Sequence, residues 1–353
     1  MAKRPDATNQ RKVEHIAIIN EDRETDRRKF YFDEVRLRHR ALPEINFDEV
    51  DTSIEFLGKR LTAPILISSM TGGDHATLRT INRNLAAAAE RCQVALGVGS
   101  QRVMFTNPKS RSSFALRAIA PTTCLLANLG AVQLNEGFGL EHCREAVAAL
   151  GADALYLHLN PLQEAVQPEG DTQFRGLAKK IGEIARHLGK PVILKEVGAG
   201  LSREDVQLVA SRGVRYIDVA GSGGTSWSRI EHHRQDKRSA NDLGILFQDW
   251  GIPTPRALWE LREFRPRITL IASGGLRSGL DMAKALVLGA SLCGMAAPFL
   301  AAAQQSTAAV VQQIERLQRE LRTAMFLLGI RRIADLIGNT SLLMDPPGAE
   351  KRL

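Results

Sequence analysis

Eight short apolar runs, rich in β-branched residues, recur along the chain after residue 63, and each is followed by glycine or polar residues. They occupy residues 64–69, 94–99, 124–130, 154–160, 191–198, 215–221, 268–275 and 290–297. Helical periodicity fills several of the intervals between them, and alternating strands and helices are typical of a parallel sheet. Because eight strands close a barrel whose interior is filled by side chains, the pattern predicts a (β/α)8 TIM barrel.

The helical segments and the ends of the chain complete this prediction. Apolar residues at three- and four-residue spacing predict helices at 78–91, 140–150, 174–188 and 203–212, with a last helix at 307–328 outside the eight units. We expect an N-terminal extension (1–62, with short segments at 13–20 and 32–42), a barrel (63–337) and a C-terminal tail (338–353). A doubly wound sheet is the alternative, but neither half has a G-x-G-x-x-G turn after its first strand.

The composition is that of a folded soluble protein with an excess of basic residues. In 353 residues there are 47 Lys+Arg and 39 Asp+Glu, which gives a net charge of +8 and permits an anionic partner. Nucleic acid is not favoured, because aromatic residues make up only 5% and the basic residues alternate with acids. A small anionic molecule therefore remains the favoured partner.

The sequence gives no sign of zinc, disulfides, secretion or a membrane span. Cys92, Cys124, Cys143 and Cys293 form no C-x-x-C pair, and the first fifteen residues have no apolar core, so we expect a reducing cytoplasm. No charged residue occurs at 285–314, but glycines, Pro298 and four glutamines interrupt this run. A helix end, a core strand and a packed loop explain it better than a membrane helix.

Polar and small residues cluster at the ends of the predicted strands. They are Ser69, Met70 and Thr71; Ser100, Gln101 and Arg102; Asn128; His158 and Asn160; Lys195; Ser222 and Thr225; Gly274, Gly275, Leu276 and Arg277; and Ala296 and Ala297. In a barrel, the loops after the strands meet at one mouth, which carries the functional site. We therefore expect all of these residues around one cavity.

Two strand ends indicate anion chemistry. The Gly274–Gly275 turn and the small residues at 294–297 follow the seventh and eighth strands, where barrels often bind phosphate, although a plain turn is the alternative. Lys195 lies within an apolar strand and could balance an anion such as a reduced flavin. A surface lysine and a Schiff-base lysine of an aldolase are the other interpretations.

A third strand end indicates metal binding. Glu164 follows a predicted turn at Pro161 that redirects the chain over the mouth, so it could bind Mg²⁺ that also contacts substrate phosphates; a solvated carboxylate is the alternative. Arg11, Lys12 and His15 could fold over an anionic ligand, or belong to a solvated basic tail. The long loop at 222–253 is expected to be a lid or disordered, and its adjacent His232 and His233 are not expected to share a metal.

Eight segments together resemble type II isopentenyl diphosphate isomerase, a flavin-dependent (β/α)8 enzyme family of isoprenoid biosynthesis. They are RKVEHI (11–16), FDEVRLRHRALPE (32–44), FLGKRLTAPILISSMTGG (56–73), GSQR (99–102), LHLNPLQE (157–164), VILKEVGAG (192–200), DVAGSGGTSW (218–227) and ASGGLRSGLDMAKALVLGA (272–290). The resemblance extends from Arg11 to about Ile337, in the same order along the chain.

The resemblance implies a role for each matching position. FMN contacts are implied for Ser69, Met70, Thr71, Ser100, Asn128, Lys195, Ser222 and Thr225, with Gly275, Leu276, Arg277, Ala296 and Ala297 at its phosphate. Substrate contacts are implied for Arg11, Lys12, Ser100, Gln101, Arg102 and Gln163, and Mg²⁺ binding for Glu164. Catalytic roles are implied for His158, Asn160, Gln163, Lys195 and Glu231, with Trp227 closing the site.

The implied reaction interconverts isopentenyl and dimethylallyl diphosphate, with reduced FMN as acid–base catalyst and NADPH only as the reductant of FMN. Barrels of this kind often assemble as tetramers or octamers, so a homo-oligomer is expected. Two other functions remain open. An FMN-dependent 2-hydroxy-acid oxidase or dehydrogenase shares the barrel but needs His and Arg after the sixth strand, where this chain has 222–226, SGGTS. A non-catalytic basic binding protein would lack flavin altogether.

Overall fold

The computed structural model describes residues 7–27, 31–70, 72–235 and 241–344. Within these ranges, eight parallel strands form a closed barrel in the order β10-β3-β4-β5-β6-β7-β8-β9, which confirms the predicted (β/α)8 barrel. The strands are β3 (Ile65–Ile67), β4 (Ala95–Gly97), β5 (Leu125–Gly130), β6 (Ala154–Leu159), β7 (Val192–Glu196), β8 (Tyr216–Asp218), β9 (Thr269–Ser273) and β10 (Leu292–Met295). Each lies inside one of the eight predicted runs.

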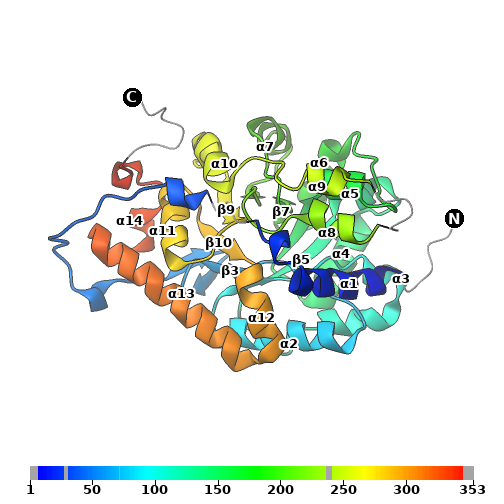
Figure 1. Cartoon of the computed structure of the whole chain (residues 1–353), viewed down its shortest axis with the longest axis horizontal. Coiled ribbons are helices and arrows are strands. Elements are labelled where there is room, and N and C mark those ends of the chain that lie inside the picture. The colour runs from blue at the N-terminus through cyan, green and yellow to red at the C-terminus, as the bar shows by residue number, and fades with distance from the viewer. Residues whose placement is uncertain (1–6, 28–30, 71, 236–240, 345–353) are drawn as a thin grey trace.

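Helices surround the barrel and follow most of the strands (Figure 1). They are α1 (Ala7–Glu21), α2 (Ala76–Cys92), α3 (Val103–Thr106), α4 (Leu140–Leu150), α5 (Pro161–Val166), α6 (Leu177–His187), α7 (Arg203–Ala210), α8 (Trp227–His233), α9 (Leu243–Leu246), α10 (Thr254–Leu261), α11 (Gly279–Val287), α12 (Ala297–Gln305), α13 (Thr307–Leu328) and α14 (Ile333–Leu336). The helices α4 and α13 have the predicted bounds. Helix α13 begins after the cap Ser306, ends at the left-handed Gly329 and packs along α2, α11 and α12.

The inner surface of the barrel has an apolar lower layer and a polar upper layer. The lower layer contains Leu66, Ala95, Leu126, Tyr156, Ile193, Ile271 and Leu292. Two residues further along the same strands come Ser68, Gly97, Asn128, His158, Lys195, Ser273 and Gly294. Residues two apart on a strand share a face, and parallel strands end at the same side, so the polar layer lies at the carboxyl end.

The opposite end of the barrel is closed by an antiparallel hairpin. Its strands β1 (Ile54–Phe56) and β2 (Lys59–Leu61) are joined by a turn with Leu57 and Gly58 in left-handed conformations. Phe56 and Leu61 are buried in the apolar interior layer, and the Phe56 ring meets Tyr216 edge-on at a centroid distance of 6.1 Å. The hairpin therefore excludes water from that end of the barrel.

Several local predictions differ from the structure. The predicted turn at Pro161 is the first position of helix α5, which suits proline because its missing N–H has no intrahelical partner there. The predicted loop near Pro298 is helix α12, and parts of the predicted loop at 222–253 form α8 and α9. Residues 236–240 of that loop, and 345–353 of the tail, lie outside the described residues.

The uncharged stretch at 285–314 contains the end of α11, strand β10, helix α12 and the start of α13. Its apolar residues face the barrel and neighbouring helices, as Leu292, Phe299 and Val310 illustrate by being fully buried. None of the helices within the described ranges combines the length and hydropathy that a bilayer-spanning segment needs.

Replacing Gly274 by alanine should destabilise the barrel strongly. Gly274 has a φ of +92°, and an added Cβ would lie 2.1 Å from the carbonyl oxygen of Gly221. Left-handed strain together with a backbone clash should lower the free energy of unfolding by about 3 kcal/mol or more, measured by urea titration.

Gly58→Ala is the matched control for this measurement. Gly58 has a φ of +72° but has no atom within 4 Å of an added Cβ, so only the conformational cost of about 1 kcal/mol applies. Equal losses of the free energy of unfolding in Gly274→Ala and Gly58→Ala would contradict the close approach of Gly274 to Gly221.

Candidate active site

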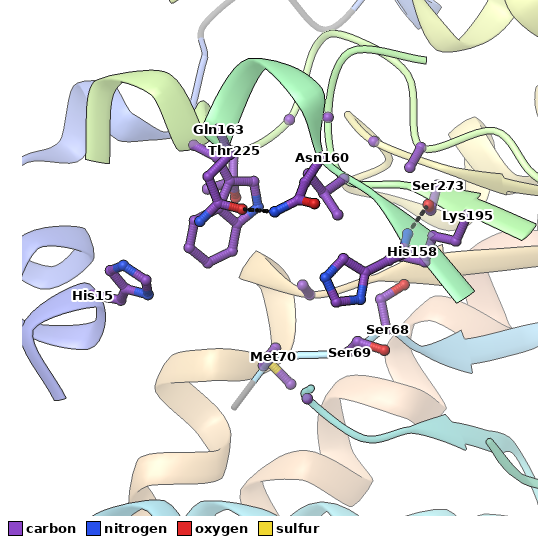
Figure 2. A pocket seen from close by; sticks show the side chains of 18 of the residues that line it. His15, Ser68, Ser69, Met70, His158, Asn160, Gln163, Lys195, Thr225 and Ser273 are labelled. Atoms are coloured by element: carbon purple, nitrogen blue, oxygen red, sulfur yellow. Dashed lines mark hydrogen bonds between the residues drawn. The ribbon is translucent and has the colours of Figure 1, made fainter. Parts of the chain in front are cut away.

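A large cavity opens at the carboxyl end of the barrel and encloses about 1620 Å³ including its open mouth. Its floor is the polar upper layer of the barrel, and its walls come from α1, α5, α8 and the loops after β8, β9 and β10 (Figure 2).

Most of the predicted site residues line this cavity. They are Arg11, Lys12, Ser69, Met70, Ser100, Arg102, Asn128, His158, Asn160, Gln163, Glu164, Lys195, Thr225, Trp227, Gly275, Leu276, Arg277, Ala296 and Ala297. Thr71 lies outside the described residues. The residues were selected as strand ends, and the closed barrel brings them together from distant parts of the chain.

Three predicted residues do not line the cavity. Gln101 is fully buried behind the wall, where its amide donates to the Ala146 carbonyl and accepts from the Asn128 N–H. The Ser222 hydroxyl accepts a hydrogen bond of 2.8 Å from Arg27. Glu231 is fully buried on α8 and reaches the site through its partners.

Four lining residues with polar side chains were not predicted: Ser68, Gln133, Gln167 and Ser273. Ser68 and Ser273 share the inward face with apolar residues two positions earlier, so strand alternation could have identified them. Gln167 follows the last residue of α5, and its side-chain amide donates to the Glu164 carboxylate. Gln133 carried no local signal, because it reaches the cavity from the short helical turn Ala131–Asn135.

One end of the cavity is built to accept an anion. Helix α12 begins there at Ala297 with no side-chain cap on Ala296, so the positive end of the helix faces the cavity. Within its first turn, Pro298 has no N–H and the Phe299 N–H donates to the Ala296 carbonyl. The glycine loops approach closely, because a Cβ on Gly224 would lie 2.8 Å from the Gly275 nitrogen. Arg277, at the same end, forms an ion pair with Asp26 of the N-terminal extension.

The other end of the cavity carries cations from the N-terminal extension. Lys12 on α1 donates a 3.0 Å hydrogen bond to the Ser100 carbonyl, and burial together with the charge of Arg11 lowers its pKa to about 7. Arg102 pairs with Asp171 at 2.7 Å. The predicted basic tail is thus a wall of the cavity, held against the loops after β4 and β6.

Glu164 is a buried carboxylate with three N–H donors. It accepts hydrogen bonds from the Asn160 amide at 2.8 Å, from the Asp171 backbone at 2.7 Å and from Gln167. Burial raises its pKa despite these donors. A Cβ on Gly170 would lie 1.7 Å from the Glu164 carbonyl oxygen, so the following loop is closely wrapped around this residue.

The set of donors around Glu164 limits how a metal could bind. Among the described residues, no group of three or more His, Cys, Asp or Glu side chains could hold an ion. The Asn160 side-chain oxygen is buried without a hydrogen-bond partner in the described part of the chain. Together with Glu164 it offers Mg²⁺ hard oxygen atoms, but ligands from a substrate would have to complete the shell.

A buried network joins α1, α5 and α8 beside the cavity. The Glu231 carboxylate contacts His15 at 3.1 Å, Gln163 at 2.7 Å and Arg234 at 2.5 Å. Burial alone would raise the pKa of Glu231, but the His15 hydrogen bond and the charges of His15 and Arg234 lower it overall. The ring of Trp227 packs edge-on against His15 at 5.1 Å.

His158 on the floor is a neutral hydrogen-bonding group. The Asn128 amide nitrogen donates to the Val98 carbonyl, so its oxygen faces His158 Nδ1 at 2.8 Å. Nδ1 must then carry the proton, which leaves Nε2 as an acceptor. Burial, followed by the charges of Lys195, Lys12, Arg11 and Arg102, lowers its pKa to about 3.

One family model and several known proteins are similar in sequence to this chain. The family model of FMN-dependent dehydrogenases matches residues 6–105 and 145–343. Isopentenyl-diphosphate delta-isomerase of Paracoccus zeaxanthinifaciens is 56% identical over 340 residues, covering 94% of this chain and 96% of the relative. The protein of the same name from Hydrogenovibrio crunogenus is 53% identical over 335 residues, covering 95% and 98%.

Solved structures show the fold at lower identity. A flavocytochrome b2 variant with sulfite bound superposes with a TM-score of 0.68 at 21% identity, covering 94% of this chain and 80% of that chain. A mandelate oxidase variant gives a TM-score of 0.62 at 20% identity, with 88% of each chain covered. At this identity, the likeness concerns the barrel alone.

The neutral state of His158 should make stability depend on pH. Folded protein keeps His158 unprotonated down to about pH 3, whereas the unfolded chain protonates it below about pH 6.5. Stability is therefore lost as the pH falls through this window, by about 2 kcal/mol between about pH 7 and pH 5. Urea titrations of the parent and His158→Gln at both pH values should show a smaller loss in the variant.

His39→Gln, at an exposed histidine, is the control and should retain the parental pH dependence. An identical loss in His158→Gln and the parent would contradict the buried neutral imidazole.

Proposed function

The chain belongs to the isopentenyl-diphosphate delta-isomerases, within the family of FMN-dependent dehydrogenases, and on that premise we propose that it interconverts isopentenyl and dimethylallyl diphosphate. One observation carries the proposal beyond the family. The cavity has two separate anion-accepting ends, at α12 and at Arg11, Lys12 and Arg102, joined by a polar floor. The two ends would hold the phosphate of the flavin and the diphosphate of the substrate at the same time.

The residues present fit FMN. The hydroxyl oxygens of Ser68 and Ser69 are buried without hydrogen-bond partners in the described ranges, so they can form hydrogen bonds with a polar ligand. A Cβ on Gly294 would lie 2.5 Å from the Ser68 oxygen, which shows how little space the floor leaves. We assign the ring contacts to Ser69, Met70, Thr71, Ser100, Asn128, Lys195 and Thr225, and the phosphate contacts to Gly275, Leu276, Arg277, Ala296 and Ala297. Ser222 would act indirectly, by holding Arg27 against the same loop.

The substrate diphosphate is assigned to the cationic end. Arg11, Lys12 and Arg102 would hold its oxygens, with Ser100 and Gln163 beside them, while Gln101 supports the wall from behind. Glu164 would bind Mg²⁺ together with diphosphate oxygens, since one carboxylate plus phosphate oxygens is a common set of ligands for this ion.

The chemistry requires a proton to be added at one carbon and removed from another, without net redox change. Reduced FMN, when bound, would supply an electron-rich ring and a proton donor and acceptor at N5. The chain contributes Gln163, whose amide donates to the ionised Glu231, so that its oxygen is turned toward other partners such as Asn160 at 3.1 Å. His158 Nε2 would accept a hydrogen bond at the floor, and Trp227 would keep water from the alkene.

We also propose that the protein works in the cytoplasm and forms a homo-oligomer. Cys92, Cys124, Cys143 and Cys293 are free thiols, which suits the reducing cytoplasm. We propose that the chain associates into a tetramer or octamer, with the apolar side chains of Leu246 and Trp250, 73% and 61% exposed, as candidates for subunit contacts.

Oxidation of a 2-hydroxy acid is the weaker alternative. The loop after β8 presents Thr225 and glycine backbone to the cavity, and none of residues 222–226 is the His or Arg that such chemistry needs there.

NADPH should be consumed far below stoichiometry during turnover. The isomerisation leaves the oxidation level of the substrate unchanged, so the reductant is needed only to bring FMN to its reduced state. An anaerobic assay of purified protein with Mg²⁺, isopentenyl diphosphate and a trace of NADPH should give many dimethylallyl diphosphate molecules per NADPH oxidised. One NADPH lost per product would refute the proposed function.

Glu164→Gln should weaken productive binding of the diphosphate. The amide keeps the shape of the side chain but loses the charge that Mg²⁺ requires, so we expect at least a tenfold higher Mg²⁺ requirement or loss of activity, with FMN retained. Activity across a Mg²⁺ titration and the flavin absorbance of the purified protein measure the two effects.

Glu145→Gln is the control, because Glu145 pairs with Arg111 on the exposed face of α4. Loss of FMN from Glu164→Gln, with activity restored by added FMN, would assign Glu164 to the flavin site and contradict its proposed role.

A further inference from the structure

Next to Lys195 on the cavity floor lies a buried carboxylate to which the proposed chemistry assigns no role. The Asp218 carboxylate, fully buried at the end of β8, lies 3.2 Å from Lys195 Nζ and accepts hydrogen bonds from the hydroxyl groups of Tyr156 at 3.0 Å and Ser273 at 2.5 Å. Lys195 in turn donates to the Ser273 oxygen at 3.1 Å (Figure 2). The four side chains form one closed network.

Strand register creates this network. Lys195 and Asp218 are directly paired across β7 and β8, and both point into the barrel. Tyr156 comes from β6 and Ser273 from β9, so four consecutive strands each contribute one member. Lys195 and Ser273 line the cavity, whereas Asp218 and Tyr156 lie beneath them.

The charges of the network cancel inside the barrel. The Asp218 carboxylate contacts the Lys195 ammonium group and two hydroxyl donors, so its charge has compensating partners in the interior. Burial and the neighbouring carboxylate raise the pKa of Tyr156 well above its ordinary value. Its hydroxyl therefore stays protonated and donates a hydrogen bond to Asp218. The cavity thus meets the ammonium end of a neutral pair, not an uncompensated cation.

We propose that Asp218 is a positioning residue that orients Lys195 toward the cavity and cancels most of its charge there. The group above it would then meet a directed N–H donor rather than a full positive charge. This inference rests on the proposed function, because that group is taken to be FMN. Tyr156 and Ser273 hold Asp218 in the orientation that points Lys195 upward.

Asp218→Asn should change the reduction equilibrium of bound FMN. Removing the buried negative charge leaves Lys195 uncompensated, and reduction, which adds electron density to the ring, becomes more favourable. Equilibration of the holoprotein against a reference dye should show at least about a tenfold higher ratio of reduced to oxidised flavin, which equals a shift of about +30 mV for a two-electron couple.

Asp153→Asn is the matched control. Asp153 also pairs with cations, Arg117 at 2.8 Å and Lys59 at 3.5 Å, but it precedes β6 at the opposite end of the barrel. Its loss should lower the free energy of unfolding and leave the flavin ratio unchanged. If Asp218→Asn likewise destabilises the protein without changing the ratio, Asp218 is merely structural and the inference is overturned.

The double variant Lys195→Gln/Asp218→Asn covers the case in which Asp218→Asn does not fold. Two neutral amides replace the pair, which avoids an unpaired buried charge. Because only the dipole of the pair is lost, the flavin ratio should stay within about threefold of the parent. A tenfold or larger fall would mean that Lys195 acts as an uncompensated cation, which contradicts the inference.

FMN titration of the parent distinguishes failure of the proposed function from failure of the proposed role of Asp218. Failure of the parent to bind FMN would overturn the proposed function itself. Retained FMN with an insensitive reduction ratio in Asp218→Asn would overturn only the role of Asp218.

Discussion

The closed ring of eight parallel strands is the constraint on which the rest of the structure depends. Ring closure gives the sheet a single inner surface, and the two-residue alternation of side chains decides what that surface carries. Lower positions such as Leu126 and Ile193 are apolar, while Asn128 and Lys195, two residues later, form the polar floor. A shift of one residue in any strand would place its polar side chain against the outer helices, so fold and site share one register.

Several charged side chains are buried in the structure, and each has its own set of polar partners. Lys195 has Asp218, and Glu231 has Arg234 and His15. Glu196, on the outward face of β7, accepts hydrogen bonds from four consecutive backbone N–H groups at 197–200. Such pairing makes the charges tolerable in the interior and also holds the side chains in one orientation, which a site for proton transfer requires.

The N-terminal extension completes the site instead of standing apart from it. Helix α1 supplies Arg11, Lys12 and His15 to the cavity wall, and Figure 1 shows it lying beside α8. The segment after it is hydrogen-bonded to the loop after β8, with the Ser226 N–H donating to the Thr25 carbonyl and the Arg27 N–H to that of Gly224. Because these segments are some 200 residues apart, the cationic end of the cavity exists only in the folded chain.

The sequence by itself determined the eight strands, the bounds of α4 and α13 and the set of polar strand ends, because periodicity and turn residues are local properties that act over a few neighbours. It did not determine α8, α12 or the length of α1, whose sequences lack a strong apolar stripe. In the folded chain α12 packs against α13 and α2, and α8 packs against α9, α5 and α1. Nor did the sequence reveal that Gln101 lies behind the wall or that Asp218 pairs with Lys195. Those facts depend on strand register and ring closure, which bring together residues that can lie more than 200 positions apart, such as His15 and Glu231, and no local pattern records such a pairing.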